Sequence, residues 1–205
     1  DVYNSQAPSV IGTQRQSFEY DGLGRVTLAQ DDASTSDGFV DSEVAFSYDS
    51  LGKVLSEAQT WRDSSSGALL TGTQTVTSVY DGVGFRLSVA YPNDRTVSFL
   101  PDELNRPERI VDSATGTVRY DYLGAQRVLN RIYPNGTKLT MLNGATDNIG
   151  GGYDAARRLV DFANKLSSTG ADLARFGYGY DPAGNRTFER RIHEPSESNW
   201  KGETF

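Results

Sequence analysis

Short runs of alternating apolar and polar residues recur along this chain. In the first clear example, Val44, Phe46 and Tyr48 are separated by the small residues between them. Successive side chains of a β-strand point to opposite faces, so this two-residue period predicts a strand with one apolar face. The same alternation recurs over residues 86–91 and 175–180. The pattern predicts a chain built mainly of β-strands.

A five-residue pattern, Tyr-Asp-x-x-Gly, punctuates these runs. It occurs five times, whereas the composition predicts roughly 0.1 occurrences by chance. The copies are Tyr20-Asp21-Gly24, Tyr48-Asp49-Gly52, Tyr80-Asp81-Gly84, Tyr120-Asp121-Gly124 and Tyr180-Asp181-Gly184. Two degenerate copies are Tyr153-Asp154-Ala155-Ala156-Arg157 and Pro101-Asp102-Glu103-Leu104-Asn105. A basic residue follows each copy closely: Arg25, Lys53, Arg86, Arg106, Arg127, Arg158 and Arg186.

The residue types of the motif predict a hairpin turn. An aspartate at the first position accepts hydrogen bonds from turn amides, and a glycine adopts the left-handed conformation at no steric cost. Tyr is predicted to end the incoming strand, and the basic residue to start the outgoing strand, where it stacks on a Tyr ring or pairs with an Asp. A second turn signal recurs as Tyr91-Pro92-Asn93 and Tyr133-Pro134-Asn135-Gly136.

The spacing of the motifs selects among repeat architectures. Successive Asp positions lie between 19 and 33 residues apart. Propellers and strict solenoids need units of fixed length, so this irregular period favours hairpins of variable length along one sheet. We therefore predict a long, twisted antiparallel sheet of about a dozen strands, with one hairpin per repeat.

One stretch has an ambiguous period. Leu159, Phe162, Ala163 and Leu166 recur at helical spacing. The stretch directly follows a repeat turn, however, and the repeat position outweighs the local period. We predict a strand here.

Composition and charge narrow the possible partners. The formal net charge is −7, and hydrophobic residues make up 37% of the chain. Nucleic-acid binding needs clustered cations, so a nucleic-acid partner is not expected. No stretch approaches the about 18 apolar residues of a membrane-spanning helix, so membrane insertion is not expected either. The chain has no Cys, which excludes disulfides and thiolate chemistry. We predict no cofactor and no metal site.

Isolated features that resemble catalytic or ligand sites have simpler interpretations. Acids such as Glu19, Glu43 and Glu57 fall on predicted strand faces, and His193 is the single histidine, which leaves no partner for a His-based site. Residues 32–43 resemble a calcium loop, but the required Gly falls one place late, which favours a polar hairpin loop. The sequons at Asn135 and Asn185 and the glycines 150–152 are interpreted as turn residues.

The repeated Tyr-Asp-x-x-Gly-Arg pattern resembles the RHS/YD-repeat family over residues 18–190. This family includes bacterial RHS toxins, the shell components of insecticidal toxin complexes, and teneurins. The resemblance implies a β-sheet that spirals into a barrel-like shell, which in the bacterial toxins encloses a C-terminal toxic domain. The self-cleaving protease region of the family is not recognisable here. The expected origin is a secreted or cell-surface protein, of bacterial source.

The sequence thus predicts an all-β, non-enzymatic structural segment over residues 1–205, drawn from a longer repeat array. Its expected partners are neighbouring repeats of the same or identical chains, with an enclosed C-terminal toxin or surface glycans as further partners. The wall of a shell and the wall of an extracellular fibre both fit the repeat chemistry. The alternative function is a module that binds carbohydrate or a cell surface through exposed Tyr residues. We expect the Tyr residues to serve mainly in cross-strand packing.

Overall fold

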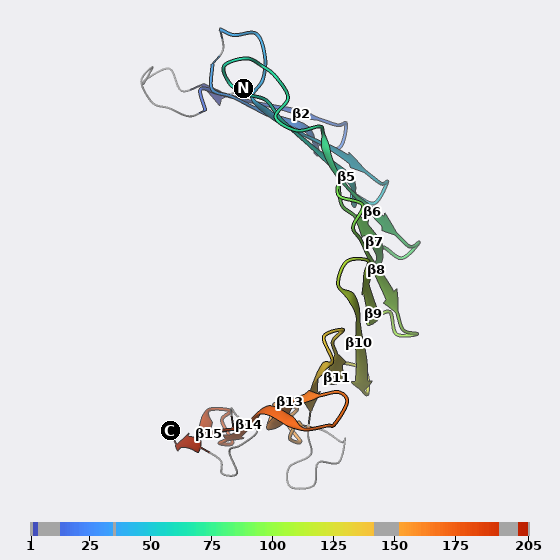
Figure 1. The fold of residues 1–205 in the computed structure, drawn as a ribbon, viewed down its shortest axis with the longest axis vertical. Coiled ribbons are helices and arrows are strands. Elements are labelled where there is room, and N and C mark those ends of the chain that lie inside the picture. Colours follow the sequence, from blue (N-terminus) through green and yellow to red (C-terminus); the bar gives the residue numbers. More distant parts are fainter. Residues whose placement is uncertain (1, 4–12, 35, 142–151, 193–200, 205) are drawn as a thin grey trace. The chain divides into compact units, whose positions relative to one another are not determined.

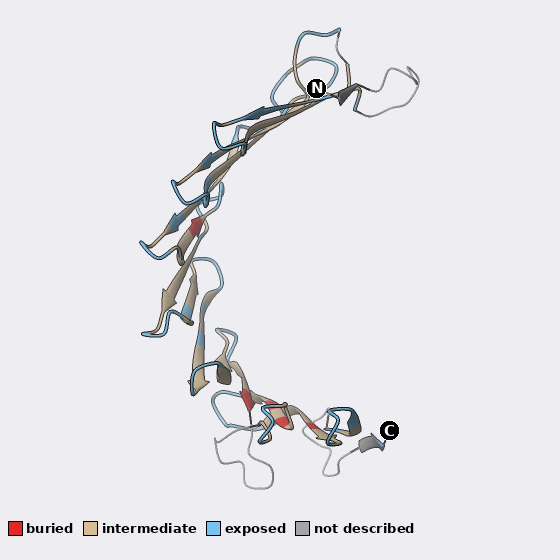
Figure 2. Cartoon of the chain, turned by 180° about the vertical axis from the view of Figure 1, so that it is seen from behind, coloured by how far each residue is buried: buried red, intermediate tan, exposed pale blue. Residues whose placement is uncertain are grey.

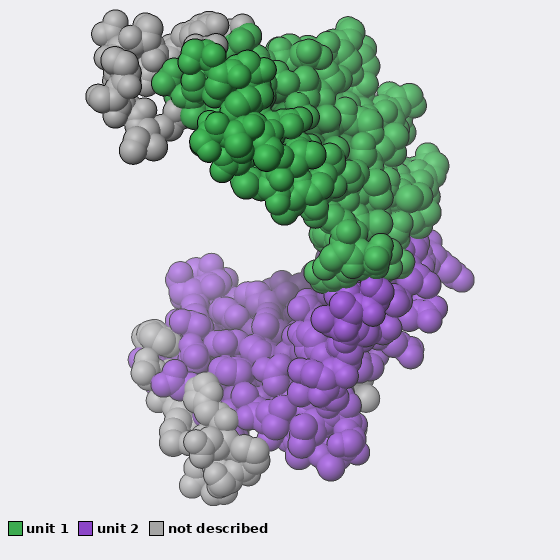
Figure 3. Space-filling model, turned by 45° about the horizontal axis from the view of Figure 1, so that its top comes forward, with its two compact units in different colours: residues 1–98 green, residues 99–205 purple. Residues whose placement is uncertain are grey.

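A computed structural model describes residues 2–3, 13–34, 36–141, 152–192 and 201–204 of the 205-residue chain. The chain divides into two compact units, Asp1–Ser98 and Phe99–Phe205, which Figure 3 shows in separate colours. The described residues form strands, turns and loops and contain no helix. They therefore include no helical segment that could cross a membrane.

The strands follow one another in the sheet in chain order (Figure 1). The first unit contains β1 Val2–Tyr3, β2 Arg15–Tyr20, β3 Val26–Asp32, β4 Ser42–Tyr48, β5 Val54–Trp61, β6 Gln74–Tyr80 and β7 Arg86–Ala90. Strand β8, Thr96–Pro101, spans the unit boundary. The second unit contains β9 Pro107–Asp112, β10 Gly116–Leu123, β11 Arg127–Ile132, β12 Thr137–Met141, β13 Asp161–Leu166, β14 Asp172–Tyr180, β15 Arg186–Ile192 and β16 Lys201–Thr204.

The predicted all-β class and the predicted long antiparallel sheet are confirmed. Neighbouring strands pair antiparallel, as in β4 and β5, where Phe46 lies opposite Glu57. The sheet has sixteen strands, more than the dozen predicted, because short strands such as β1 and β16 also join it. The ambiguous stretch forms strand β13, with Ala163 fully buried, so its predicted strand conformation is confirmed.

The sheet buries little apolar surface (Figure 2). Among the described residues, the buried apolar side chains are those of Val89, Met141 and Ala163. The chain exposes 12789 Å², whereas a compact monomer of 22.4 kDa exposes about 9,400 Å². A single layer of strands leaves both of its faces without a second layer, so hydrophobic burial alone does not hold this sheet together.

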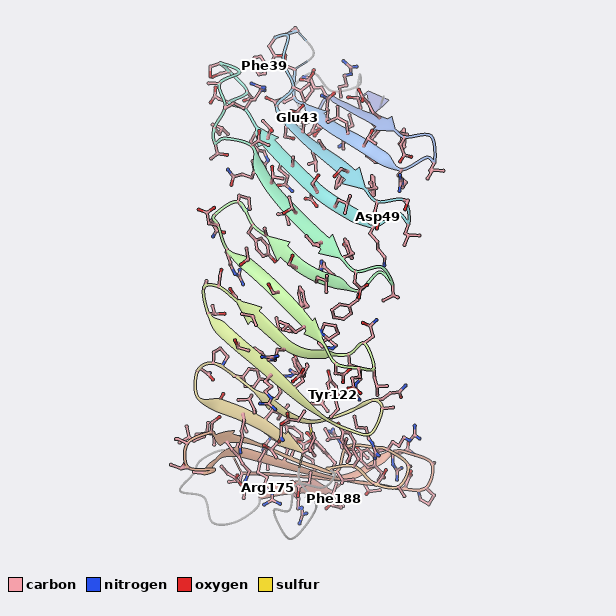
Figure 4. All side chains as sticks on the ribbon, turned by 90° about the vertical axis from the view of Figure 1, so that its right-hand side faces the viewer. Phe39, Glu43, Asp49, Tyr122, Arg175 and Phe188 are labelled. Atoms are coloured by element: carbon pink, nitrogen blue, oxygen red, sulfur yellow. The ribbon has the colours of Figure 1, made fainter. Side chains whose placement is uncertain are left out.

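In the second unit, one buried ion pair supplements the small apolar core. Asp161 is 4% exposed and is the first residue of β13, two positions before the fully buried Ala163. The guanidinium of Arg175, labelled in Figure 4, donates to both carboxylate oxygens of Asp161, at 3.1 and 2.8 Å. A two-pronged contact of this kind is among the stronger side-chain hydrogen bonds. It ties β13 to β14 on the face that also buries Ala163 and Thr140.

The loop that resembles a calcium site folds through hydrogen bonds within the chain. The Asp41 carboxylate accepts a hydrogen bond from the Ala33 amide at 2.6 Å, and the Asp37 carboxylate accepts one from the Phe39 amide at 3.4 Å. The Phe39 ring, labelled in Figure 4, lies where a Cβ atom on Gly67 would stand, so this loop packs on the next one along the same edge. Within the described part of the chain, no group of three or more acidic or histidine side chains could hold a metal ion.

The hairpin turns share one backbone geometry. At the first copy, the Asp21 amide donates to the Arg25 carbonyl at 2.9 Å, and the Gly24 amide donates to the Asp21 carbonyl at 3.0 Å. The Asp21 carboxylate accepts from the amides of Leu23 and Arg25. The strand register shifts by one residue just before the turn, beside Tyr20. These are the marks of a three-residue hairpin loop that ends in a glycine bulge.

The fourth residue of each such turn has a positive φ. Gly24 has φ +77°, and Gly52, Gly84 and Gly184 have similar values. In the two degenerate copies this place belongs to Asn105, with φ 59°, and Arg157, with φ 66°. Asn tolerates the left-handed region, whereas Arg does so with strain. The degenerate copies therefore form the same turn as the others at a higher conformational cost.

This geometry predicts that Gly24→Ala lowers the free energy of unfolding by about 1–2 kcal/mol. A Cβ atom at Gly24 meets nothing within 4 Å, so the cost comes from the backbone conformation alone. Chemical denaturation of the 205-residue chain would measure it. Gly22→Ala is the matched control, because Gly22 also faces open space and its φ lies outside the left-handed region. Equal stability of both variants would show that the turn does not need a positive φ.

Candidate functional site: the cations that link successive repeats

The basic residue of one repeat reaches the tyrosine and the turn of the next repeat. Arg25 Nε donates to its own Asp21 carboxylate at 2.6 Å, and Arg25 Nη1 donates to the Asp49 carbonyl of the following turn at 3.0 Å. Its guanidinium carbon lies 4.6 Å from the centre of the Tyr48 ring. The Tyr48 hydroxyl donates back to the Val26 carbonyl at 2.7 Å. We call this arrangement a cation link. Figure 4 labels Asp49 at its turn.

The second unit contains two links of the same form. Arg106 donates to its own Asp102 at 2.7 Å and to the Gly124 carbonyl at 2.6 Å, and it stands 4.0 Å from the Tyr122 ring centre. The Tyr122 hydroxyl donates to the Pro107 carbonyl at 2.8 Å. The Arg106 side chain and the Tyr122 hydroxyl thus each donate to a backbone carbonyl of the other repeat.

Arg158 forms the third complete link. Its Nε donates to Asp154 at 2.7 Å, its Nη1 donates to the Asp181 carbonyl at 2.8 Å, and its guanidinium lies 4.7 Å from the Tyr180 ring centre. The Tyr180 hydroxyl donates to the Leu159 carbonyl at 2.9 Å. In all three links the tyrosine therefore bonds the carbonyl directly after the basic residue.

Only arginine can make all of these contacts at once. Its planar guanidinium has five donors in a fixed fork and a flat face that stacks on an aromatic ring. In Arg25 and Arg158, Nε donates to the aspartate carboxylate of the same repeat, and Nη1 donates to a backbone carbonyl of the next turn. The flat face of the guanidinium lies over the tyrosine ring of the next repeat. Each charge-assisted hydrogen bond contributes more than a neutral one, and the stacking adds about 0.5–2 kcal/mol. A link therefore joins two hairpins without an apolar core between them.

The links that depart from this pattern are looser. Lys53 stands 5.9 Å from the Tyr80 ring centre, and Arg127 stands 5.6 Å from that of Tyr153. The Tyr153 hydroxyl still donates to the Val128 carbonyl at 3.1 Å. The corresponding place in the last turn belongs to Asn185, whose side-chain amide donates to Asp181 at 2.9 Å. In the third turn it belongs to Phe85, and the basic residue Arg86 comes one position later.

The turn carboxylates are held in their charged form. The Arg25 amide, together with the Arg25 guanidinium, lowers the pKa of Asp21. The Arg106 guanidinium lowers the pKa of Asp102, the Arg158 amide lowers that of Asp154, and the Asn185 side chain lowers that of Asp181. These acids accept hydrogen bonds as carboxylates, which is a structural task and not the task of a proton donor.

One predicted motif residue pair lies inside a strand instead of at a turn. Tyr120 and Asp121 belong to β10, which continues to Leu123 before the chain reverses. Tyr122, labelled in Figure 4, takes the place under Arg106, and its ring stacks on that of Tyr120 at 6.3 Å. The spacing from Asp102 to Asp121 is the shortest between successive motifs, at 19 residues. The tyrosine that lies under Arg106 is therefore Tyr122, two residues after the motif residue Tyr120.

The other predicted turn residues lie at hairpin turns of the sheet. These are Tyr20, Asp21, Gly24, Tyr48, Asp49, Gly52, Tyr80, Asp81, Gly84, Gly124, Tyr153, Asp154, Tyr180, Asp181 and Gly184. His193 and the glycines 150 and 151 lie outside the described residues. Asn135 and Gly136 form the turn between β11 and β12, where the Asn135 side chain accepts from the Thr137 amide at 3.1 Å.

The sequence did not identify the direction of the links. The expected stacking of a basic residue on a Tyr ring and its pairing with an Asp both occur, but the Asp belongs to the same repeat and the Tyr to the next one. The missed signal is the position of the basic residue, four places after the Asp, because this places it on the strand beside the next Tyr. The aromatic residues also pack against one another, as in the Phe162 and Phe176 pair at 5.0 Å.

Known structures share this fold. The chain superposes on a chain of the crystal structure of TcdB2-TccC3-TEV with a TM-score of 0.57 and 14% sequence identity, over 87% of this chain and 10% of that one. A Photorhabdus luminescens Tc holotoxin pore with a TccC3 mutation gives a TM-score of 0.56 at 14% identity, again over 87% and 10%. The crystal structure of TcdB2-TccC3-Cdc42 gives the same score and identity, over 86% and 10%.

The chain thus spans about a tenth of the length of the structures it matches. No protein-family model matches the sequence, and no curated protein matches it either. At this identity the likeness establishes a shared fold.

The links predict that Arg158→Lys lowers the free energy of unfolding by about 1–2 kcal/mol, because lysine cannot hold the carboxylate, the carbonyl and the ring together. A double-mutant cycle with Tyr180→Leu, measured by chemical denaturation, should give a coupling energy of about 0.5–1.5 kcal/mol. Arg119→Lys is the control, because Arg119 is exposed and stands 3.5 Å from its partner Asp121. Additive effects of Arg158→Lys and Tyr180→Leu would contradict a link between them.

The lowered carboxylate pKa values predict acid sensitivity. In the unfolded chain these Asp residues titrate at about 3.9. Their folded pKa values lie below this, so the stabilisation is complete above pH 3.9 and is lost as the pH falls through the folded values. Denaturation midpoints between pH 7 and pH 2 would report the loss. The combined change Asp21→Asn, Asp102→Asn and Asp154→Asn should flatten this dependence, whereas Asp37→Asn, in an exposed loop, should leave it as in the parent chain.

Proposed function

We propose that this chain is a non-enzymatic wall segment of an RHS/YD-repeat protein. The observation that carries the proposal is the cation link, which in three places passes completely from one repeat to the next and joins hairpins without a core. Such links can join one hairpin after another into a long sheet. The turn carboxylates, which are the most regular acids of the chain, serve as acceptors in these turns. The proposed wall role therefore assigns these carboxylates a structural task and requires no catalytic residue.

The structures that share the fold support the wall role. They are TcdB2-TccC3 complexes and a Tc holotoxin pore, which are by name parts of toxin assemblies. By this likeness we extend the proposal to a secreted or cell-surface protein of bacterial origin. Its partners would be further repeats of the same kind and, in a closed shell, an enclosed C-terminal toxin.

One edge of the first unit offers a surface for such partners. The third residue of each turn is apolar and exposed, with Leu23 75%, Leu51 70% and Val83 80% exposed. These three tips stand on successive turns at one edge of the sheet, because each turn connects an even-numbered strand to the next one. A row of exposed apolar side chains at a fixed motif position favours contact with another wall segment. We call it the apolar tip row.

The apolar tip row predicts that the combined change Leu23→Ser, Leu51→Ser and Val83→Ser weakens self-association of the chain at least tenfold. The melting temperature of the monomer should change little, since exposed substitutions cost at most about 0.5 kcal/mol each. Sedimentation velocity across a concentration series would measure the association. Gly22→Ser with Gly82→Ser is the control, because these residues lie in the same turns and carry no apolar side chain. Equal association of both variants would exclude the tip row as a contact surface.

Negative-stain electron microscopy of the native full-length protein tests the wall itself. Hollow particles would support a closed shell, and long uniform fibres would support a polymer built from the same sheet. Compact, solid particles would contradict both forms of the proposal.

A further inference from the structure

Cavities open beside two of the looser links, one in each unit. The cavity beside Lys53 in the first unit has a volume of about 480 Å³, and its lining includes the acid Glu57 together with Tyr80 and Arg86. The cavity beside Arg127 in the second unit is smaller, at about 240 Å³. It is lined by Leu123, Ala125, Gln126, Arg127 and Arg157. Among the described residues, the lining of this second cavity thus has two arginines and no carboxylate.

The link at Arg127 lacks an aspartate of its own. In the three complete links the guanidinium pairs with the aspartate four positions earlier in the chain, as Arg158 pairs with Asp154. The residue four positions before Arg127 is Leu123, because Tyr122 takes the place of the motif tyrosine and the next residue takes that of the aspartate. Within the described part of the chain, no carboxylate pairs with Arg127. One negative charge of the complete links is therefore missing here.

The turn that follows adds a second cation at the same place. Arg157 occupies the position of the motif glycine, with φ 66°. At this position a Cβ atom points toward the cation of the preceding repeat, as at Gly52, where it would stand 3.9 Å from Arg25 Nη1. The same geometry directs the Arg157 side chain toward Arg127, and both side chains line the cavity.

The chain itself does not compensate this pair of cations. An arginine with a positive φ is strained, and strained residues cluster at sites that bind a ligand. Two guanidinium groups that share one cavity also repel each other. Among the described residues, the side chain of Arg157 makes no hydrogen bond and no ion pair. An anion held between Arg127 and Arg157 would offset the repulsion and supply the missing charge.

The lining selects among anions by charge and by size. A carboxylate has one charge and two oxygens, which match one guanidinium, whereas a phosphate group has nearly two charges and oxygens for both. The side-chain amide of Gln126 can donate one more hydrogen bond. The volume of about 240 Å³ lies below the about 300–1,000 Å³ of sites for larger molecules, which favours a small anion. Ala125 and Gln126 are exposed, so solvent reaches the cavity.

We propose that Arg127 and Arg157 bind a phosphate group, which takes the place of the missing aspartate. Each guanidinium pairs with oxygens on its own side of the phosphate. The bound group thereby joins the turn at residues 123–127 to the turn at residues 153–158, and a small anion completes a link that the chain leaves open. The proposal uses the geometry of the links and does not depend on the wall role.

The test is titration of the 205-residue chain with sodium phosphate at neutral pH and constant ionic strength, followed by nuclear magnetic resonance. We expect a dissociation constant of about 1 mM. The melting temperature should rise with the phosphate concentration, because a ligand that binds the folded state alone stabilises it. Acetate, which has one charge, should bind at least tenfold more weakly.

Methyl phosphate distinguishes two sources of the phosphate group. Tighter binding of methyl phosphate than of inorganic phosphate would support a phosphate monoester as the ligand. Weaker binding of methyl phosphate would support the free ion.

Arg157→Gly is the decisive variant, because it removes one cation and restores the residue that this turn position favours. Phosphate should bind at least tenfold more weakly, while the melting temperature without phosphate stays equal or rises. Asn105→Gly is the matched control, since it makes the same change in the other degenerate turn. This control should bind phosphate like the parent chain.

Leu123→Asp tests the missing carboxylate directly. The new aspartate should pair with Arg127, as Asp154 pairs with Arg158, and phosphate should then bind at least tenfold more weakly. Leu123→Asn has a side chain of the same size without the charge, so it should bind phosphate like the parent chain.

Three results would overturn the proposal. Unchanged phosphate binding by Arg157→Gly would place the anion elsewhere. An equal loss of binding in Asn105→Gly would mean that the cavity beside Arg127 is not the site. Equal affinity for acetate and phosphate would mean that the two arginines do not select a group with two negative charges.

Discussion

The contact between an arginine, its own aspartate and the next tyrosine is the interaction on which this sheet depends. A β-hairpin alone is marginal in water, and three or more strands usually need an apolar face to be stable. Here the described residues bury three apolar side chains. Each complete cation link supplies a set of charge-assisted hydrogen bonds and a stacked ring that join one hairpin to the next. Stability is therefore distributed along the sheet and not concentrated in a core.

This distribution explains why the repeats tolerate irregular lengths. The link is made at the turn edge, between residues at fixed positions of two successive motifs, as Arg25 and Tyr48 show. The hairpin between the two motifs reverses at the opposite edge, where its loop length does not affect the contact. The loop at residues 33–41 and the tight turn at residues 133–137 can thus serve the same purpose. Loops of different length are therefore tolerated at this opposite edge.

Departures from the repeat are where other chemistry becomes possible. An arginine in the link donates both to the carboxylate of its own repeat and to a carbonyl of the next turn. With Lys53 in that place, two fewer hydrogen bonds are made, and an ammonium, a phenol and a cavity remain. Lysine in place of arginine thus leaves a link with fewer contacts beside a cavity with a polar and aromatic lining. Arginine at the linking position thus joins two hairpins, whereas lysine at the same position leaves a looser contact beside a cavity.

The sequence by itself determined the strands, the antiparallel hairpins and the turn positions, because these follow from a two-residue period and from turn chemistry within five residues. It even resolved most of residues 158–166 as a strand, observed at Asp161–Leu166, against their helical spacing. The tertiary structure alone decided which tyrosine each cation covers and where β10 ends, since Tyr122 displaces Tyr120 only through contact with Arg106, on another strand. It also decided that Lys53, Arg86 and Glu57 surround one cavity. Local rules set the elements, but contacts between residues far apart in the chain depend on strand register, which a single sequence does not specify.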